Sequence, residues 1–367
     1  MRNQPLIRAV LILLLFFAVI AGVVLAGSFL KPLALALLIA LLLVPVARKL
    51  EKSGVGRFAA CILADLIFVL VVAGILFLLS YQVKQVAGDW DQIQKEGKEQ
   101  FEKVQTFIVK QVGVSEKEQE QAIEKAVNNF ASGSQSKFTS MLKNTLGSVG
   151  DLLLIAIYIL LLLYYRHKFA NFVYKAFSGT QKSKLRKILE GSKNTAVNYL
   201  GGRLILIVLL AIFYSIGFLA FGVKYAIFYA VFASILTLIP YLGNVIGVML
   251  PLATTLLSDD PGQAFFGVLI VFAIIQFLES YILQPLVVGK KVNINPFFTI
   301  FIVVLGGAIW GVIGMMVAIP YLGILYVIMN NTEKLKPYAY LIGEEEDSDS
   351  DSGIEKAMGK LKDKITG

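Results

Sequence analysis

The stretch VNINPFFTIFIVVLGGAIWGVIGMMVAIPYLGILYVIMNNT, from Val292 to Thr332, decides the fold of this chain. None of its 41 residues is Asp, Glu, Lys or Arg. A helix of about 20 residues crosses the hydrocarbon of a bilayer, so this run is too long for one crossing. Four glycines interrupt its middle, and Pro320 follows them. The stretch therefore predicts an integral membrane protein whose membrane helices are interrupted.

The composition of the whole chain agrees with a membrane location. Hydrophobic residues make up 57% of the 367 residues, charged residues make up 16%, and the mean hydropathy is +0.74. These values lie far from those of a soluble domain, so the lipid bilayer is the expected main solvent. The formal net charge is +9, but Lys and Arg cluster beside the apolar runs, as in multi-span proteins. We therefore expect no nucleic-acid partner.

The sequence offers no set of residues for a metal, a cofactor or a reaction. Cys61 is the only cysteine and His167 the only histidine. A single thiol excludes an intrachain disulfide, and a lone His lacks the partners of a usual metal site. No Gly-x-x-x-x-Gly-Lys-Ser/Thr loop is present to bind ATP phosphates. We predict that the chain is not an enzyme and uses neither a cofactor nor a metal.

The order of apolar and charged segments predicts an all-α integral membrane protein with about eight transmembrane helices. Arg2 and Arg8 precede a long apolar run, which we interpret as a retained span; the second span is expected to begin at Pro32. The predicted segments are transmembrane spans 1–3 in residues 1–83, an extracytoplasmic helical insertion in 84–150, transmembrane span 4 in 151–165, a basic cytoplasmic segment in 166–203, spans 5–8 with broken helices forming a transport region in 204–332, and a cytoplasmic acidic tail with a short amphipathic helix in 333–367.

Basic residues predict the orientation of these spans. A loop rich in Lys and Arg follows the second span at 48–57, and the segment 166–203 carries many basic residues against one acid, Glu190. Such segments stay in the cytoplasm. Both termini are therefore expected in the cytoplasm. The insertion has apolar residues three and four apart, which predicts a small extramembrane subdomain of amphipathic helices. We expect this subdomain to pack on the bundle; the alternative is a domain that binds a ligand.

Two overlong apolar runs, 225–258 and 292–332, share a short repeat. Ile239-Pro240-Tyr241-Leu242-Gly243 recurs at positions 319–323. Proline and glycine free backbone polar groups that lipid cannot satisfy, and paired broken segments are typical of transporter substrate sites. Each run could be a re-entrant hairpin or a span with an unwound centre; the alternative is that the prolines serve packing only. The candidate residues of a broken-helix substrate path are Pro240, Tyr241, Gly243, Asn244, Pro285, Asn293, Asn295, Pro296, Gly306, Gly307, Gly311, Gly314 and Pro320.

Carboxylates within the apolar runs are the candidates for ion coupling. Glu279 is the only charge between Pro261 and Gly289 and lies beside a polar stripe formed by Gln276, Ser280 and Gln284. A charge at mid-bilayer costs roughly 2.5–3.5 kcal/mol on insertion scales, so it usually faces a cavity or a partner. Asp65 in the third span is the second candidate. The alternative for Glu279 is neutralisation by protonation or by a basic partner such as Arg203.

The segment Gln284-Pro285-Leu286-Val287-Val288-Gly289-Lys290-Lys291-Val292-Asn293-Ile294-Asn295-Pro296 resembles the signature of the autoinducer-2 exporter family, the PerM-like permeases. Pro240 to Gly243, Glu279 to Gln284, the glycines at 306–314 and Pro320 extend the resemblance, and the arrangement of spans fits nearly the whole chain. The family often has His where this chain has Asn295, so no histidine-based proton step is carried over. Asn244 also replaces the last residue of its Pro-Leu-Gly-Pro motif.

The resemblance implies a secondary transporter in the bacterial inner (plasma) membrane. The implied activity is export of the small quorum-sensing signal autoinducer-2, or, as in other members, exchange of sodium or lithium for protons. It also implies a homo-oligomer, with a pentamer as the expected size. A channel or a non-transporting membrane scaffold is the further alternative, and neither needs a coupling carboxylate. The pair Lys290 and Lys291 is cytoplasmic if both long runs are hairpins and external if the first run crosses once.

Overall fold

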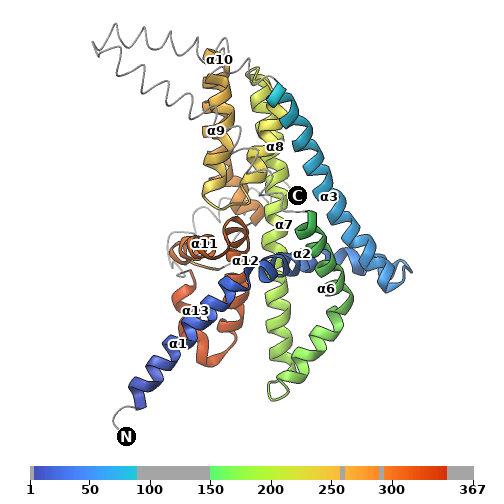
Figure 1. Cartoon of the computed structure of the whole chain (residues 1–367), viewed down its shortest axis with the longest axis vertical. Coiled ribbons are helices and arrows are strands. Elements are labelled where there is room, and N and C mark those ends of the chain that lie inside the picture. The colour runs from blue at the N-terminus through green and yellow to red at the C-terminus, as the bar shows by residue number, and fades with distance from the viewer. Residues whose placement is uncertain (1–3, 89–148, 257–260, 289–292, 345–367) are drawn as a thin grey trace, which may run out of the picture.

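The computed structural model describes residues 4–88, 149–256, 261–288 and 293–344. Within these ranges every regular element is a helix (Figure 1). Six helices are long and apolar enough to cross a membrane, and four shorter apolar helices accompany them. These helices confirm the predicted all-α membrane fold. Most of the predicted insertion, the pair Lys290 and Lys291, and the tail from residue 345 lie outside the described residues.

The N-terminal unit consists of α1 (Gln4–Leu25), α2 (Gly27–Lys52), α3 (Arg57–Gly88) and α6 (Val149–Ala176). Its core joins small residues of α2 and α3 to larger apolar residues of α6, which allows close helix packing as in other membrane bundles. α1 extends away from the other helices (Figure 1) and leaves most of its apolar side chains exposed.

The prediction that the second helix begins at Pro32 is wrong. α2 begins at Gly27, and Pro32 lies inside it. The break falls five residues earlier, beside the Trp310 side chain: a Cβ added at Gly27 would lie 3.6 Å from the indole nitrogen, in ordinary van der Waals contact. Trp310 Nε1 also donates a hydrogen bond to the Val23 carbonyl at 3.1 Å. A contact with a distant helix therefore fixes the junction.

α7 (Lys182–Ala220) is the central helix of the molecule (Figure 1). At about 1.5 Å per residue its length is about 58 Å, nearly twice the hydrocarbon thickness of a bilayer. Its first half is basic and its second half is apolar. The predicted basic segment 166–203 is thus mostly helical, because α6 continues to Ala176 and only Phe177–Gln181 separates it from α7.

The run 225–258 forms a hairpin of two short helices, α8 (Ala226–Leu236) and α9 (Leu242–Leu256). They are antiparallel: Gly247 packs on the Ala233 backbone, and Gly243 packs on the Leu236 carbonyl. At about 1.5 Å per residue, arms of this length reach about 16 and 22 Å and cannot cross a hydrocarbon layer of about 30 Å. Neither arm is therefore long enough to span a membrane, and the run folds back on itself as a helical hairpin.

The chain then continues through α10 (Pro261–Leu278) into a π-helix, η1 (Glu279–Val288). Pro285 lies within η1. π-helical turns are rare and widen the backbone, often at functional sites. Here the change from α-helix to π-helix occurs at Glu279 itself. The predicted polar stripe therefore spans two kinds of helix.

The run 292–332 forms a second hairpin, α11 (Pro296–Trp310) and α12 (Val312–Asn330), followed by η2 (Glu333–Leu335) and α13 (Lys336–Ile342). The turn lies at Gly311, whose φ of 66° favours glycine. The arms touch where Gly306 meets the Gly314 backbone. In Figure 1 this hairpin lies below the α8–α9 hairpin.

The prediction that Pro320 breaks its helix is wrong. Pro320 is buried in the interior of the continuous helix α12, and the chain reverses at Gly311 instead. A tight reversal needs a backbone conformation with positive φ, which glycine adopts and proline cannot. The two copies of the Ile-Pro-Tyr-Leu-Gly repeat therefore differ in structure: the first is the tip of a hairpin, and the second is continuous helix.

Candidate functional site

A cavity of about 480 Å³ lies where the tip of the α8–α9 hairpin meets α7, η1 and the α11–α12 hairpin. Ligand sites in proteins commonly measure about 300–1,000 Å³. The hairpin tip supplies Pro240, Tyr241, Asn244 and Val245. The other lining residues are Tyr199, Arg203, Phe272, Gln276, Glu279, Ser280, Gln284, Ile294, Thr299 and Ile319.

Glu279 is the centre of a polar network beside this cavity. Its side chain is only 3% exposed. Asn244 Nδ2 donates to Glu279 Oε2 at 2.8 Å and to Gln276 Oε1 at 3.0 Å. Gln276 Nε2 in turn donates to Ser280 Oγ at 3.2 Å. The network thus joins the hairpin tip to the junction of α10 and η1.

Arg203 connects the same network to the central helix. Its Nη1 lies 4.0 Å from Glu279 Oε1, and its Nη2 donates a hydrogen bond to the Thr237 carbonyl. Thr237 follows the last residue of α8, so its carbonyl is one of those that a helix end leaves without an intrahelical donor. Arg203 satisfies this carbonyl inside the protein. It therefore stabilises both the hairpin break and the buried carboxylate.

The first turn of α9 adds to the favourable environment of Glu279. Asn244 lies in that turn, and a helix N-terminus carries a partial positive charge that favours a nearby anion. Among the residues that the structure describes, Arg203 and Glu279 are the charged ones that line the cavity. Their charges balance, while amide and hydroxyl groups supply further hydrogen-bond donors and acceptors. The described part of the lining thus combines one pair of opposite charges with neutral polar groups.

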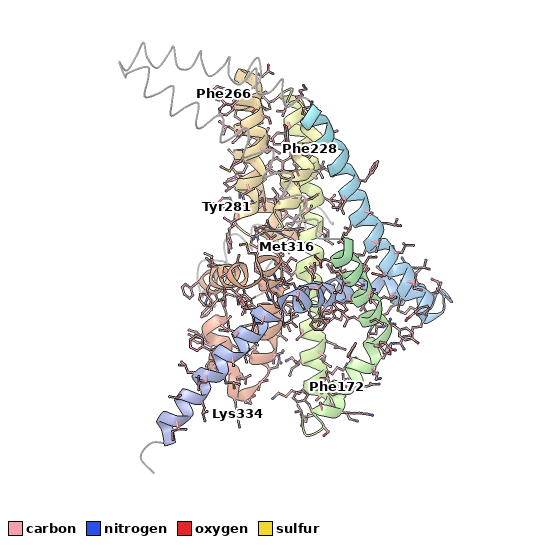
Figure 2. The ribbon with its side chains drawn as sticks, in the orientation of Figure 1. Phe172, Phe228, Phe266, Tyr281, Met316 and Lys334 are labelled. Carbon is pink, nitrogen blue, oxygen red and sulfur yellow. The ribbon has the colours of Figure 1, made fainter. Side chains whose placement is uncertain are left out.

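The orientation of η1 separates the cavity side from the outer side of the helix. Ser280 and Gln284 line the cavity, whereas the side chain of Tyr281 is 72% exposed. Tyr281 is labelled in Figure 2, at the same level as the central part of α7. The polar stripe predicted from positions 276, 280 and 284 thus lies on the face of α10 and η1 that lines the cavity.

Six of the candidate residues for ion coupling or the substrate path lie together at the cavity. They are Pro240, Tyr241, Asn244, Gln276, Glu279 and Gln284. Gly243 is adjacent and packs within the hairpin. The candidates that do not line this cavity are Asp65, Pro285, Asn293, Asn295, Pro296, Gly306, Gly307, Gly311, Gly314 and Pro320.

The asparagines of the Asn-Ile-Asn-Pro segment anchor α11 to the C-terminal helices. Asn295 Oδ1 accepts a hydrogen bond from the Phe298 backbone N–H at 3.0 Å and caps α11, with Pro296 as the first helical residue. Asn295 Nδ2 donates to the Leu341 carbonyl at 3.0 Å. Asn293 Nδ2 donates to the Tyr326 hydroxyl at 3.1 Å. These residues hold one edge of the cavity in place without lining it.

Asp65 lies in a different part of the molecule. It is on α3, where its side chain is 9% exposed. Its neighbours along that helix, Cys61 and Ala64, pack in the core formed with α2 and α6. It therefore does not share a site with Glu279. Within the described ranges no group of three or more His, Cys, Asp and Glu side chains could hold a metal ion.

Several cavity residues were absent from the predicted set. The sequence pattern identifies Arg203 only as a possible partner of Glu279 and gives no role to Tyr199. Tyr199 lies one helical turn before Arg203, and residues four apart share a helix face; that spacing was the available signal. Thr299 similarly lies one turn after Asn295. The apolar lining residues Phe272, Ile294 and Ile319 carry no sequence signal that separates them from other membrane residues.

Comparisons with known proteins agree with this architecture. The family model described as AI-2E family transporter matches residues 10–334. A provisionally named transport protein of Borreliella burgdorferi is 25% identical over 343 residues, covering 93% of this chain and 91% of that protein. YueF of Bacillus subtilis, also provisionally named as a transport protein, is 27% identical over 217 residues, or 58% of each chain. The provisionally named permease PerM of Escherichia coli K12 is 25% identical over 342 residues, covering 88% and 93%.

The family match includes both hairpins, the central helix α7 and every residue of the polar network. It also covers the apolar helices that are long enough to cross a membrane. The chain therefore belongs to the AI-2E family of membrane transporters.

Proposed function

We propose that this protein is a secondary transporter that exports a small polar solute across the bacterial inner membrane, with autoinducer-2 as the solute. The observation that carries the proposal is the re-entrant hairpin tip, which places Asn244 on Glu279 beside a cavity of about 480 Å³. Broken helices that bring polar groups to the middle of a membrane protein are typical of secondary transporters.

The contacts of the hairpin tip suggest how a solute moves through. Arg203 binds the Thr237 carbonyl, and Asn244 binds Glu279. Hydroxyl groups of a solute can replace either contact, because they both donate and accept hydrogen bonds. A solute that replaces both contacts frees the tip to move relative to α7. Alternating access then follows from motion of the α8–α9 hairpin against α7 and η1.

The polarity of the cavity supports a hydroxyl-rich solute without net charge. Among the described residues of the lining, one carboxylate and one guanidinium balance each other, and Gln276, Gln284 and Ser280 add neutral polar groups. A monovalent cation bound at Glu279 would also lie beside the positive charge of Arg203, which repels it. Autoinducer-2, which the family resemblance implies, fits this preference for a small polar solute.

Exchange of sodium or lithium for protons is the second candidate function. The observation that favours it is the 4.0 Å separation of Arg203 Nη1 and Glu279 Oε1, which leaves that oxygen loosely paired. A carboxylate that exchanges a proton for a cation needs such an accessible oxygen. Transport measurements separate this function from autoinducer-2 export, and both functions from a channel or a scaffold.

The test uses the full chain reconstituted in liposomes that contain a pH-sensitive dye. Autoinducer-2, sodium and lithium are supplied in turn, and solute flux is measured with and without a pH gradient. We expect autoinducer-2 flux in the wild type and at least a tenfold slower flux in Glu279→Gln. Glu333→Gln is the matched control, because Glu333 is an exposed carboxylate outside the network.

The outcomes distinguish the candidates. Cation-dependent proton movement without autoinducer-2 flux supports the antiport function and contradicts our proposal. Flux that ignores the pH gradient and survives Glu279→Gln unchanged indicates a channel. Absence of flux for all three solutes, in vesicles that contain correctly oriented protein, supports a scaffold.

A further inference from the structure

A second cavity, of about 340 Å³, lies between the last turns of α2 and the first half of α7, away from the proposed transport site. Four basic residues line it: Arg48, Lys49 and Lys52 from α2, and Lys193 from α7. Val44 and Pro45 complete the lining. We call these six residues the basic pocket. No residue of the basic pocket lines the Glu279 cavity.

The three cations of α2 are arranged unfavourably for a helix without a bound anion. Lys52 follows Arg48 by four residues and Lys49 by three, so the three side chains share one helix face. Like charges at these spacings destabilise a helix. α7 brings the Lys193 charge to the same place. A bound anion would offset the repulsion among all four groups.

The nearby carboxylates do not neutralise the basic pocket. Glu51 forms an ion pair with Arg166, and Glu190 forms an ion pair with Arg186 at 2.9 Å. Across the part of the chain that the structure describes, no ion pair includes a cation of the basic pocket. The pocket therefore presents four positive charges to an anion from outside this part of the chain.

The position of the pocket indicates where such an anion comes from. α2 is an apolar helix long enough to cross a membrane, and its cations occupy its last turns. Basic side chains at that level meet lipid head groups, and basic pockets between helices bind anionic lipids. Val44 and Pro45 give the pocket an apolar side, which acyl chains can contact and a free phosphate ion cannot use.

We propose that the basic pocket binds a phosphate-bearing anion, supplied by the phosphodiester head group of an anionic lipid in the inner leaflet. The bound head group bridges α2 and α7. Because Lys193 lies on the same helix as Tyr199 and Arg203, the lipid also fixes the helix that carries one wall of the transport cavity. The proposal concerns a binding site and stands whether or not autoinducer-2 is the transported solute.

Native mass spectrometry of the full chain in detergent tests the proposal. The protein is incubated with dioleoylphosphatidylglycerol or with dioleoylphosphatidylcholine, and retained lipid is counted. The test variant replaces Arg48, Lys49, Lys52 and Lys193 with Gln. The control variant removes the same number of charges by replacing Lys168, Lys175, Lys182 and Lys187, which are exposed residues outside the pocket. Size-exclusion chromatography verifies that both variants fold.

We expect the wild type and the control variant to retain at least tenfold more phosphatidylglycerol than phosphatidylcholine, and the pocket variant to lose this preference. Equal retention by the pocket variant and the wild type would overturn the proposal. Equal losses in both variants would also overturn it, because they would indicate general charge attraction. Competition with inorganic phosphate identifies the source of the bound anion. If millimolar phosphate displaces the lipid, the pocket binds free phosphate; if the lipid stays bound, the pocket binds the lipid head group.

Discussion

Glu279 and Asn244 show how a buried charge is accommodated in this protein. The carboxylate accepts a hydrogen bond from the amide of a residue 35 positions away and lies near one guanidinium. A buried group that loses its hydrogen-bond partner costs about 1–3 kcal/mol, and more when it is charged. The Asn244 contact that stabilises the hairpin tip therefore also occupies the carboxylate, so a change that frees the carboxylate destabilises the tip.

Asn244→Leu should destabilise the protein and slow transport. The substitution removes the donor shared by Glu279 and Gln276, which should lower the free energy of unfolding by about 1–3 kcal/mol. Thermal unfolding in detergent and solute flux in liposomes measure the two effects. Asn194→Leu is the control, because Asn194 is exposed on α7. Equal effects of the two substitutions would show that the Asn244 contact contributes neither to stability nor to transport.

Tyr241→Gly should separate stability from transport. Tyr241 has a φ of 65°, a conformation that costs a residue with a side chain about 1–2 kcal/mol, and its side chain lines the cavity. We expect unchanged or higher thermal stability together with slower transport. Tyr225→Gly is matched, since Tyr225 has a φ of 61° and does not line the cavity. Normal transport in Tyr241→Gly would remove this ring from the proposed solute path.

At the scale of elements, the two hairpins have different causes for their turns. The first turns at Thr237–Tyr241, where Pro240 and the strained Tyr241 interrupt the helix. The second turns at Gly311 alone. In both hairpins, small residues let the two backbones approach: Gly247 meets Ala233, and Gly306 meets Gly314. The close approach of the two arms therefore depends on these small residues as well as on the turn residues.

Gly314→Val should disrupt the α11–α12 hairpin. A Cβ at this position meets the Gly306 carbonyl, and it also lies 2.9 Å from Trp310 Cβ. Overpacking of a tight contact costs about 1–3 kcal/mol or more. We expect a lower unfolding temperature and faster proteolysis at the turn. Gly74→Val on α3 is the control, because no atom lies within 4 Å of a Cβ built there, and it should leave the unfolding temperature nearly unchanged.

At the scale of the whole molecule, the fold makes a prediction about orientation. α7 begins at a basic end and should cross the membrane once, while the α8–α9 hairpin returns to the side that it enters. In a Cys61→Ala background, Ser183→Cys should react with an impermeant thiol reagent only from the cytoplasm. Gln263→Cys, at the start of α10, should react only from outside. The reverse pattern would invert the orientation of the whole protein.

The family membership motivates a prediction about assembly. We propose a homo-oligomer, with the pentamer as the expected form. The apolar surface of α11 includes Phe297, Phe301 and Val304, which are all more than half exposed in one chain, and either lipid or another copy covers it. Native mass spectrometry in mild detergent measures the mass of the assembly. A monomer at all protein concentrations would contradict the proposed assembly.

The membrane fold and part of the site could be predicted from local features of the sequence. A long apolar run indicates that lipid surrounds the helix, and a proline in such a run indicates an interruption of the helix. The polar stripe at Gln276, Ser280 and Gln284 follows from spacing along one helix. These features depend on neighbouring residues alone. The same reasoning predicts a break at Pro320, because a proline inside a continuous helix and a proline at a turn look alike in the local sequence. It gives no role to Tyr199, because that residue does not differ locally from the other residues of its helix.

What the sequence by itself determined is the bilayer as solvent, the helical backbone and the existence of two interrupted runs. Only the tertiary structure decided that both runs fold back as hairpins, that the second turns at Gly311, and that Asn244 and Arg203 meet Glu279 while Asp65 does not. The physical reason is that hydrophobic and turn patterns act over one or two helical turns. Contacts between residues 35 or 76 positions apart depend instead on how complete helices pack against one another.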